Sequence, residues 1–551
     1  MVNQYTAALD PAAWWAAGDT PVREGCEAMP LVDGHAAMLA MCRAFLSARQ
    51  YILLAGWDIH VELPMVRGDD VRLGADDSPR QRELLASLRE DGLDDEALAL
   101  WNANSLRVVD VLGFAARRGV RVGVLLWDAF HLGSHITNDP AQQRDLLAAA
   151  GVDCLLDDSS RDVRHLTQSL HQKCCVVDGH TAFVGGVDLT VQYGGDYDRW
   201  DTHGHACSSP DRVTERRPAA HPWHDVHVRL RGPVVGDIQR NIAQRWTEVA
   251  RRHVAADWPS ELPIGAASFA SGGVPAQVVR TIPPHTYAFA PHGITTIKQL
   301  YINALAQARR YVYFENQYLW PEVFRGLDTL SWGGKSPDVQ ELLDAMGGAL
   351  ARGVQLAFTL PDHPNCGRRF TDGGIEWLRQ RAAEAGDSAS VSVFTLGNCE
   401  PDENLHGGIF YRPVYTHAKV AIVDDSFWTV GSANLNSRGM ATDAEINVGV
   451  LDPVSARDLR LTLWREHSHA STALHSFLDD PLEGLRALRE LAAANRERVR
   501  HREAIQGHLL PYLTVDDGHH FELPVHPEHG WLDNLPGGAG PLPAHHAGRY
   551  I

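Results

Sequence analysis

The chain has 551 residues, 44% of them hydrophobic and 22% charged, which is the composition of a globular protein long enough for two large domains. Its formal net charge of -19, from 69 acidic and 50 basic residues, opposes a broad electrostatic surface for nucleic acid or an anionic bilayer. We read neither a Sec-type signal nor an apolar run of about 18 residues, so we expect a soluble protein that stays in the cytoplasm or leaves by a route without a signal peptide.

Two stretches in the first part of the chain have counterparts in the second. Residues 47–59 predict a helix end that leads into a buried strand, and residues 307–320 repeat that pattern. Residues 118–128 correspond in the same way to residues 352–362. Helical patterns alternate with short runs rich in valine, isoleucine and leucine, as expected where helices cover a mostly buried sheet.

These matches predict a duplicated, bilobal α/β fold. We expect two helix-sheet-helix lobes related by a pseudo-two-fold axis, with one active site at their interface. The N-terminal lobe is predicted to take residues 1–265 and the C-terminal lobe residues 266–551, joined through a Pro/Gly/Ala-rich stretch at about 258–284 that lacks a clear period. A helix is expected after residue 481, and a Pro/Gly/His-rich tail from about residue 524.

The pattern His-x-Lys-x4-Asp occurs once in each predicted lobe. The chain has only four lysines, and two of them belong to this pattern. The copies read HQKCCVVD and HAKVAIVD, begin 246 residues apart, and contain His171, Lys173 and Asp178 in the first and His417, Lys419 and Asp424 in the second. Each is followed at the same offset by a pair of small residues, Gly185-Gly186 and Gly431-Ser432. A matched pair is a much stronger signal than one short motif.

The two motifs together suggest phosphodiester chemistry. Both lie in apolar runs with strand character, where residues i and i+2 project to one face, so each histidine is expected beside its lysine. If the lobes pack face to face, one pocket receives two imidazoles and two ammonium groups. One neutral histidine can then attack phosphorus while the other, protonated, donates to the leaving oxygen. The lysines suit the stabilisation of the charged oxygens.

Each imidazole needs a partner, preferably a carboxylate, that fixes its tautomer and orients its ring. We predict Glu445 as the partner of His417. For His171 we predict Asp225, with Asp201 as the weaker alternative.

Four further polar residues receive expected roles. Ser432 and Asn434 can donate neutral hydrogen bonds to a phosphoryl oxygen. Asp178 and Asp424 fall beyond the strands, so we expect them to brace the lysine loops rather than contact substrate.

At these residues the chain resembles the phospholipase D superfamily, which is defined by two His-x-Lys-x4-Asp motifs. The similarity extends over most of residues 25–470, and its segments are GWDI at 56–59, FVGGVDL at 183–189, RWDTHGH at 199–205, PWHDVH at 222–227, ENQYL at 315–319 and the run at 414–445. They are typical of the phospholipase branch, whereas the nuclease and tyrosyl-DNA phosphodiesterase branches lack most of them. The first half departs from the second by carrying Asp188 where the second has Asn434, so no phosphate contact is assigned to Asp188.

The resemblance implies a mechanism and a substrate. His171 would form a phosphohistidine intermediate, His417 would act as general acid and then base, and Lys173, Lys419 and Asn434 would contact phosphate. The reaction would need no metal and no cofactor, would release phosphatidic acid and the head-group alcohol from glycerophospholipids at a membrane surface, and would extend to transphosphatidylation. The layout resembles bacterial enzymes without accessory lipid-binding domains, and we expect a monomer that binds no nucleic acid.

Three other functions remain open. A metal-independent nuclease shares the chemistry but would normally need a basic groove, which the net charge opposes. A cardiolipin-synthase-like phosphatidyltransferase is disfavoured by the missing membrane segments. A lipid-binding pseudoenzyme is disfavoured because both histidines and both lysines are present.

Three smaller groups of residues have structural interpretations. One cluster could suggest zinc, but its spacing fits no closed ligand set, so we expect polar residues around the active-site mouth; its members are His203, His205, Cys207, His221, His224 and His227. A predicted loop at 318–334 holds Tyr318, Trp320, Phe324 and Trp332. Core packing is expected there, with an aromatic lip that dips into lipid as the alternative. Cys174 and Cys175 are expected to be buried free thiols.

Overall fold

The computed structural model describes residues 11–71, 78–103, 106–129, 138–159, 168–192, 197–213, 221–253, 273–323, 334–362, 367–401, 409–469 and 476–514. The predicted tail from residue 524, together with Phe324 and Trp332, lies outside these residues. Among the helices that are described, none combines the length and the apolar character needed to cross a membrane.

Helices and strands alternate along the first half of the chain. Its strands are β1 (Arg23–Val32), β2 (Tyr51–Gly56), β3 (Arg121–Trp127), β4 (Asp153–Asp157), β5 (Cys174–Val177), β6 (Thr181–Gly185), β7 (Val191–Gln192), β8 (Tyr197–Asp198), β9 (Trp223–His224) and β10 (Val226–Arg231). Its helices are α1 (Asp33–Ser47), α2 (Pro79–Glu90), α3 (Asp95–Asn102), α4 (Val108–Arg117), α5 (Pro140–Ala149) and α6 (Val234–His253).

The second half is built in the same manner. Its strands are β11 (Val274–Ile282), β12 (Ile294–Thr295), β13 (Tyr311–Glu315), β14 (Gln355–Thr359), β15 (Val391–Pro401), β16 (Ile409–Thr416), β17 (Val420–Val423), β18 (Phe427–Gly431), β19 (Glu445–Leu451) and β20 (Leu509–Pro511). Its helices are α7 (Thr296–Gln307), α8 (Pro337–Ala351), α9 (Arg368–Glu384), α10 (Pro453–Ser468) and α12 (Pro481–Arg500).

One order of strand pairing recurs in the two halves. In the first, β4, β3 and β2 are parallel, and β5, β6, β10 and β1 follow as antiparallel neighbours. In the second, β15, β14 and β13 are parallel, and β17, β18, β19 and β11 follow as antiparallel neighbours. The strands predicted at 47–59 and 118–128, and their counterparts at 307–320 and 352–362, are confirmed as β2, β3, β13 and β14. The predicted mixed α/β class is therefore confirmed.

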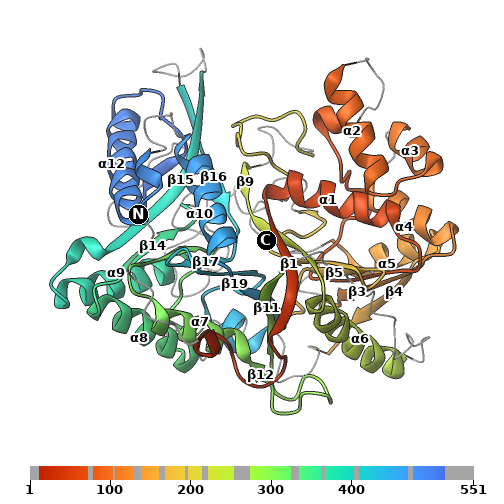
Figure 1. Cartoon of the computed structure of the whole chain (residues 1–551), viewed down its shortest axis with the longest axis horizontal. Coiled ribbons are helices and arrows are strands. Elements are labelled where there is room, and N and C mark those ends of the chain that lie inside the picture. The colour runs from red at the N-terminus through yellow and green to blue at the C-terminus, as the bar shows by residue number, and fades with distance from the viewer. Residues whose placement is uncertain are drawn as a thin grey trace, which may run out of the picture.

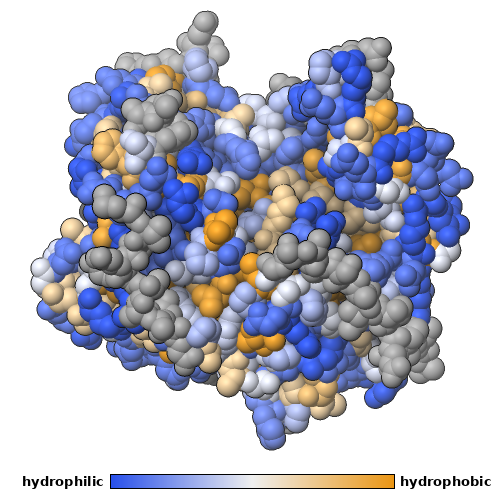
Figure 2. Space-filling view, in the orientation of Figure 1, coloured by the Kyte–Doolittle hydropathy of each residue, from blue (hydrophilic) through white to orange (hydrophobic). Residues whose placement is uncertain are grey.

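The two sets of strands join into one sheet. Antiparallel β1 and β11 connect their edges, and a short parallel pair, β9 with β16, makes a second connection. Figure 1 shows the two sets side by side, with α1 to α6 around the first and α7 to α12 around the second. In the space-filling view of this face, a notch separates the upper parts of the two halves, and several apolar residues lie below it near the centre of the face (Figure 2).

A continuous apolar core runs from one half into the other. Its buried side chains include Val228 and Trp246 from β10 and α6 together with Val414 and Trp428 from β16 and β18. Burial of this shared core fixes the relative position of the halves, because separation would expose both faces to water.

The predicted join between the lobes needs a partial correction. The stretch at about 258–284 was predicted as the join because it lacks a clear period, but its residues 274–282 form β11, whose run VPAQVVRTI pairs with β1 and β19. Prolines and glycines near this segment suggested irregular chain, although its valine and isoleucine side chains suit a buried strand. The predicted boundary near residue 265 falls outside the described residues and stays a prediction.

Candidate active site

The two motif histidines take their carboxylate partners from the opposite half of the chain. The Nδ1 of His171 lies 3.0 and 3.1 Å from the two carboxylate oxygens of Glu445. The Nδ1 of His417 lies 2.7 Å from Asp225 Oδ2. Our prediction had paired Glu445 with His417 and Asp225 with His171, and it is wrong in both cases because each pair is exchanged across the junction. Asp201, the alternative for His171, instead binds Arg212 at 2.9 Å.

Backbone hydrogen bonds explain the exchange. The amide of His171 donates to the carbonyl of Ala444 at 2.9 Å, and Glu445 is the next residue. The amide of His417 donates to the carbonyl of His224 at 2.8 Å, and Asp225 follows. Each histidine is thus fixed at its backbone and at its ring by two successive residues of the other half.

The motif histidines and lysines lie just before the strands that we predicted to contain them. Strands β5 and β17 begin at Cys174 and Val420, one residue after each lysine. Both lysines donate from Nζ to the carbonyl of the motif histidine: Lys173 to His171 at 2.8 Å, and Lys419 to His417. Each lysine therefore helps to hold the backbone of the histidine beside it.

The environments of the two lysines differ in charge. Lys173 forms a buried ion pair with Asp188, with 3.1 Å between Nζ and Oδ2, and lies 5.5 Å from the centroid of the Trp57 ring. Lys419 instead donates to the neutral side-chain oxygen of Gln317 at 3.4 Å. Asp188 thus balances one ammonium, whereas the amide group beside the other adds no charge.

Gln317 is a site residue that the sequence interpretation missed. Its Oε1 accepts a hydrogen bond from Asn434 Nδ2 at 3.3 Å as well as the one from Lys419. Two donors that were expected to bind a phosphoryl oxygen therefore converge on one oxygen atom. The segment ENQYL was recognised, but nothing in its spacing indicated which of its side chains points to the motifs.

Ser432 has a different role from the expected phosphate contact. Its hydroxyl donates to Glu445 Oε2 at 2.5 Å, so its hydrogen is committed to the carboxylate that orients His171. The equivalent residue of the first half is Gly186, where a Cβ would lie 2.0 Å from Asp225 Oδ1. Glycine leaves room for Asp225 there, while serine supports Glu445 in the second half.

Asp178 and Asp424 brace the chain, but at residues 49–51 and 309–311 rather than at the lysine loops that we predicted. The Asp178 carboxylate accepts hydrogen bonds from the backbone amides of Arg49, Gln50 and Tyr51 at 2.7 to 2.8 Å. Asp424 accepts three equivalent bonds, at 2.7 to 2.9 Å, from the backbone amides of residues 309–311. Both aspartates begin tight turns with positive φ, 52° and 53°, a conformation that aspartate tolerates better than most residues. They fix the starts of β2 and β13 against the motif hairpins.

Burial shifts the pKa values of the site toward neutral forms. It raises the pKa of Glu445 to about 8 and that of Asp225 to about 6, against the opposing effect of the nearby lysines. It lowers the pKa of His171 and of His417 well below the usual value, and the lysine beside each histidine acts in the same direction. Burial also lowers the pKa of Lys419 to about 7. An anionic phosphodiester would favour the charged forms of Lys419 and His417, because it brings the negative charge that burial excludes.

Aromatic side chains and one arginine border the histidines. The Trp57 ring lies edge-on to His171 with centroids 5.8 Å apart. On the other side, Trp223 stacks on Tyr415 at 4.6 Å and lies 5.0 Å from His417. The guanidinium of Arg199 lies 4.0 Å from the centroid of Trp223, and its charge contributes to the low pKa of His417. Arg199 is a further cation that the motif analysis did not assign.

The other residue groups of the sequence analysis fall in different places. Tyr318 and Trp320 are buried, as core packing predicts. Cys174 and Cys175 are buried free thiols, as expected. Of the histidine cluster, His205 and His224 meet Asp33 and Glu466 in the interior, whereas His227 contacts the Val187 amide at 3.4 Å.

Two family models match the chain. The model described as "Phospholipase D" matches residues 100–322 and 411–523, and "Cardiolipin synthase, PLD-like domain" matches residues 301–465. Phospholipase D alpha 1 from Oryza sativa subsp. japonica is 25% identical, over 90% of this chain and 72% of that protein. Phospholipase D alpha 1 from Nicotiana tabacum is 24% identical, over 77% of this chain and 62% of that protein. The chain thus spans less than two thirds of the tobacco relative.

Two solved structures share low identity with the chain. Phosphatidylserine synthase from Haemophilus influenzae Rd KW20 is 12% identical with a TM-score of 0.44, over 88% of this chain and 97% of that one. The phospholipase D family member Nuc from Salmonella typhimurium is 19% identical with a TM-score of 0.22, over 35% of this chain and 91% of that one.

Proposed function

Because the chain belongs to the phospholipase D family, whose model matches more than half of its residues, we propose that it hydrolyses glycerophospholipids to phosphatidic acid and the head-group alcohol. The observation that carries this proposal is the pair of motif imidazoles, each held at Nδ1 by a buried carboxylate of the opposite half. Fixing Nδ1 in this way leaves Nε2 of each ring as the reactive nitrogen.

The reaction proceeds in two displacements at phosphorus. In the first, Nε2 of His171 attacks phosphorus and the Nε2 proton of His417 passes to the leaving head-group oxygen, so a P–N bond forms and a P–O bond breaks. In the second, His417 takes a proton from water, the water oxygen attacks phosphorus, and the P–N bond breaks. An alcohol in place of water gives transphosphatidylation.

Two cations and one neutral amide stabilise the pentacoordinate transition state. Lys173, Lys419 and Asn434 donate to the equatorial oxygens, with Gln317 holding the latter two donors in a convergent arrangement. Both histidines come from one chain, so a monomer is sufficient for the reaction. The enzyme acts peripherally on a membrane surface, where its substrate lies.

A transphosphatidylation assay tests the function. Phosphatidylcholine vesicles with ethanol should give phosphatidic acid and phosphatidylethanol with the wild type, and neither product with His171→Ala. His227→Asn serves as a control, since His227 is buried nearby but contacts the Val187 amide rather than a motif residue. The absence of any lipid product from folded wild type across a panel of head groups would reject the proposal.

The exchanged carboxylates allow the two roles to be separated. Asp225→Asn impairs His417, so a substrate whose leaving group needs no protonation should still phosphorylate His171. Glu445→Gln misorients His171 and should prevent that phosphorylation. Trapping of the phosphohistidine after acid quench distinguishes the variants. The reverse pattern would assign the attack to His417.

A phosphatidyltransferase is the second candidate, favoured by the cardiolipin synthase model that matches residues 301–465. It would use the same phosphohistidine but pass the phosphatidyl group to a lipid alcohol rather than water. Phosphatidylglycerol vesicles distinguish the two: the transferase yields cardiolipin and glycerol, whereas the hydrolase yields phosphatidic acid.

A further inference from the structure

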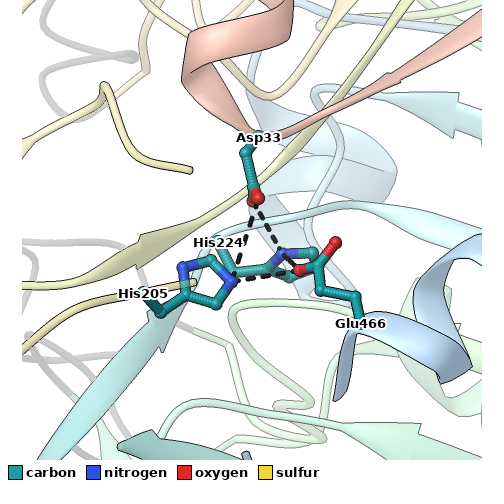
Figure 3. A group of neighbouring side chains, drawn as sticks. All are labelled: Asp33, His205, His224 and Glu466. Atoms are coloured by element: carbon teal, nitrogen blue, oxygen red, sulfur yellow. Dashed lines mark hydrogen bonds and ion pairs between the residues drawn. The ribbon is translucent and has the colours of Figure 1, made fainter. Parts of the chain in front are cut away.

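Four buried side chains from distant parts of the sequence meet at the junction of the two halves. Asp33 begins α1, His224 belongs to β9, Glu466 lies near the end of α10, and His205 follows β8 in a loop. Their exposed fractions are 1%, 0%, 8% and 0%, respectively. Figure 3 shows the two carboxylates and two imidazoles turned toward a common point.

The polar atoms of the four side chains lie within 4.8 Å of one another, close enough to surround one ion. The Nδ1 of His224 lies 2.9 Å from Asp33 Oδ1 and 3.1 Å from Glu466 Oε1. The Nε2 of His205 lies 3.0 Å from Glu466 Oε1 and 3.9 Å from Asp33 Oδ2. A zinc ion with tetrahedral bonds of about 2.0–2.1 Å holds its ligand atoms about 3.3 Å apart. Small side-chain adjustments are therefore enough to admit the ion.

The charges of the cluster also suit a divalent cation. Asp33 and Glu466 bring two negative charges into the interior, where an unbalanced carboxylate is costly. One divalent ion with two neutral imidazoles balances them. Without an ion, protonated histidines would have to balance them, including His203, whose Nδ1 lies 3.0 Å from Asp33 Oδ2 and 2.9 Å from Glu466 Oε2. Metal and protons are thus the two possible counter-charges.

The outer nitrogens of both rings face carboxylates, as they do in metal sites. The Nε2 of His224 lies 2.9 Å from Glu315 Oε2, and the Nδ1 of His205 lies 3.4 Å from Asp201 Oδ2. Metal-bound histidines almost always donate their second ring N–H to a carboxylate or carbonyl in this way, which fixes the tautomer and strengthens the ligand. The cluster therefore supplies both the ligand atoms and the carboxylates that would hold the second nitrogen of each ring.

We infer that Asp33, His205, His224 and Glu466 bind one divalent transition-metal ion, with zinc the best match, as a structural link between the halves. Each ligand offers nitrogen or oxygen, all four are buried, and four ligands close a tetrahedral site without an open position. Sequence spacing could not indicate this set, since Asp33 and Glu466 lie far from the histidines that we considered as zinc ligands.

The site supports the active site without touching substrate. His224 carries the carbonyl that accepts the His417 amide, and its neighbour Asp225 orients the His417 ring. A bound ion would fix β9, and hence Asp225, relative to α1 and α10. His203 covers the site on the solvent side, with Nδ1 at 3.0 Å from Asp33 Oδ2 and 2.9 Å from Glu466 Oε2.

An adjoining group is the less suitable metal site. His224, Glu315 and His467 also come together, but they supply only three ligands. The Glu315 oxygens already receive hydrogen bonds from Tyr313 at 2.6 Å and lie 2.7 Å from His467 Nε2. Glu315 thus serves as the outer carboxylate of His224, and His467 provides a matched control.

Metal content is the direct test and needs no lipid assay. The wild-type protein, purified without a metal-affinity tag from zinc-supplemented cells, should contain about one zinc ion per chain when measured by elemental mass spectrometry. His205→Gln and Glu466→Gln should reduce this to below about a tenth of an ion. His467→Gln, equally buried but outside the ligand set, should retain it. Cobalt uptake by stripped wild type should give the visible absorption of a tetrahedral nitrogen and oxygen site.

Wild-type measurements keep the test valid if a ligand variant fails to fold. Stripping with a chelator should lower the melting temperature, and zinc alone should restore it. The inference is overturned if the wild type contains no stoichiometric metal and takes up neither zinc nor cobalt, because the histidines then carry protons instead. Loss of zinc from His467→Gln, but not from His205→Gln, would also overturn it.

Discussion

Burial of the Lys419 ammonium should destabilise the protein in a manner that depends on pH. The side chain is fully buried, and burial lowers its pKa from the ordinary 10.5 to about 7 even though Asp225 acts in the opposite direction. Between these two values the unfolded chain holds a proton that the folded chain lacks. The destabilisation caused by this group therefore decreases as the pH rises from about 7 to 10.5, and the free energy of unfolding increases.

The shift sets the size of the effect. A difference of 3.5 pKa units corresponds to roughly 5 kcal/mol, which is the cost of the charged lysine below about pH 7. At about pH 9 only the unfolded lysine is charged, and the cost falls to roughly 2 kcal/mol. Lys419→Met should therefore stabilise the protein more at about pH 6 than at pH 9, by roughly 3 kcal/mol. Loss of the ammonium also raises the pKa of Asp225, which acts in the same direction.

Urea denaturation of wild type and variant at the two pH values measures this difference. Lys298→Met is the matched control, because Lys298 pairs with Asp338 and Glu341 at 2.8 Å and its pKa is raised. Its ammonium stays charged throughout this range in both states, so its effect on stability should not change with pH. An equal effect of Lys419→Met at both pH values would refute the reasoning.

Three further substitutions test other parts of the site. The alkaline fall of kcat/KM, expected above about pH 7 as Lys419 loses its proton, should move upward in Lys419→Arg, and an unchanged pH profile would count against it. Gly186→Ala should lower the free energy of unfolding by about 1–3 kcal/mol and should lower kcat, because the new Cβ would displace the Asp225 carboxylate. In the control Gly204→Ala the new Cβ meets open space, so both the melting temperature and kcat should stay unchanged. Asp178→Asn should lower the free energy of unfolding by about 1.5–3 kcal/mol, because the carboxylate accepts three backbone hydrogen bonds. The folded fraction should keep its kcat, and a reduced kcat at unchanged stability would contradict a bracing role.

The features that could be predicted from the sequence are those that occur once in each half. The strands β2 and β13 follow from matching apolar runs. A bracing role for Asp178 and Asp424 follows from their place after each motif strand, although the segments that they hold are the starts of β2 and β13 and not the predicted lysine loops. These are local properties, determined by residues within a few positions of one another. The position of the motif histidines was less well predicted, since they precede β5 and β17 rather than lie in them.

Contacts between the halves could not be predicted in this way. Glu445 lies 28 residues after His417 but 274 after His171, so sequence distance favoured the wrong partner. Distance along the sequence also hid a contact within the second half, because Gln317 reaches Asn434 only after β13 and β18 have paired with β17. Either carboxylate could orient either histidine chemically. Only the packing of the two halves decides which carboxylate pairs with which histidine.

The exchange of carboxylates ties catalysis to assembly of the two halves. A half that folded alone would present its histidine without the group that orients it, and its carboxylate without the ring that it orients. The cost of burying Glu445 and Asp225, seen in their raised pKa values, is partly offset by lysines: Lys419 acts on both carboxyl groups, and Lys173 of the first half acts on Glu445 of the second. The proposed activity therefore requires the complete junction. Substitutions that loosen the shared core should lower kcat through misoriented rings even when they lie far from the motif residues.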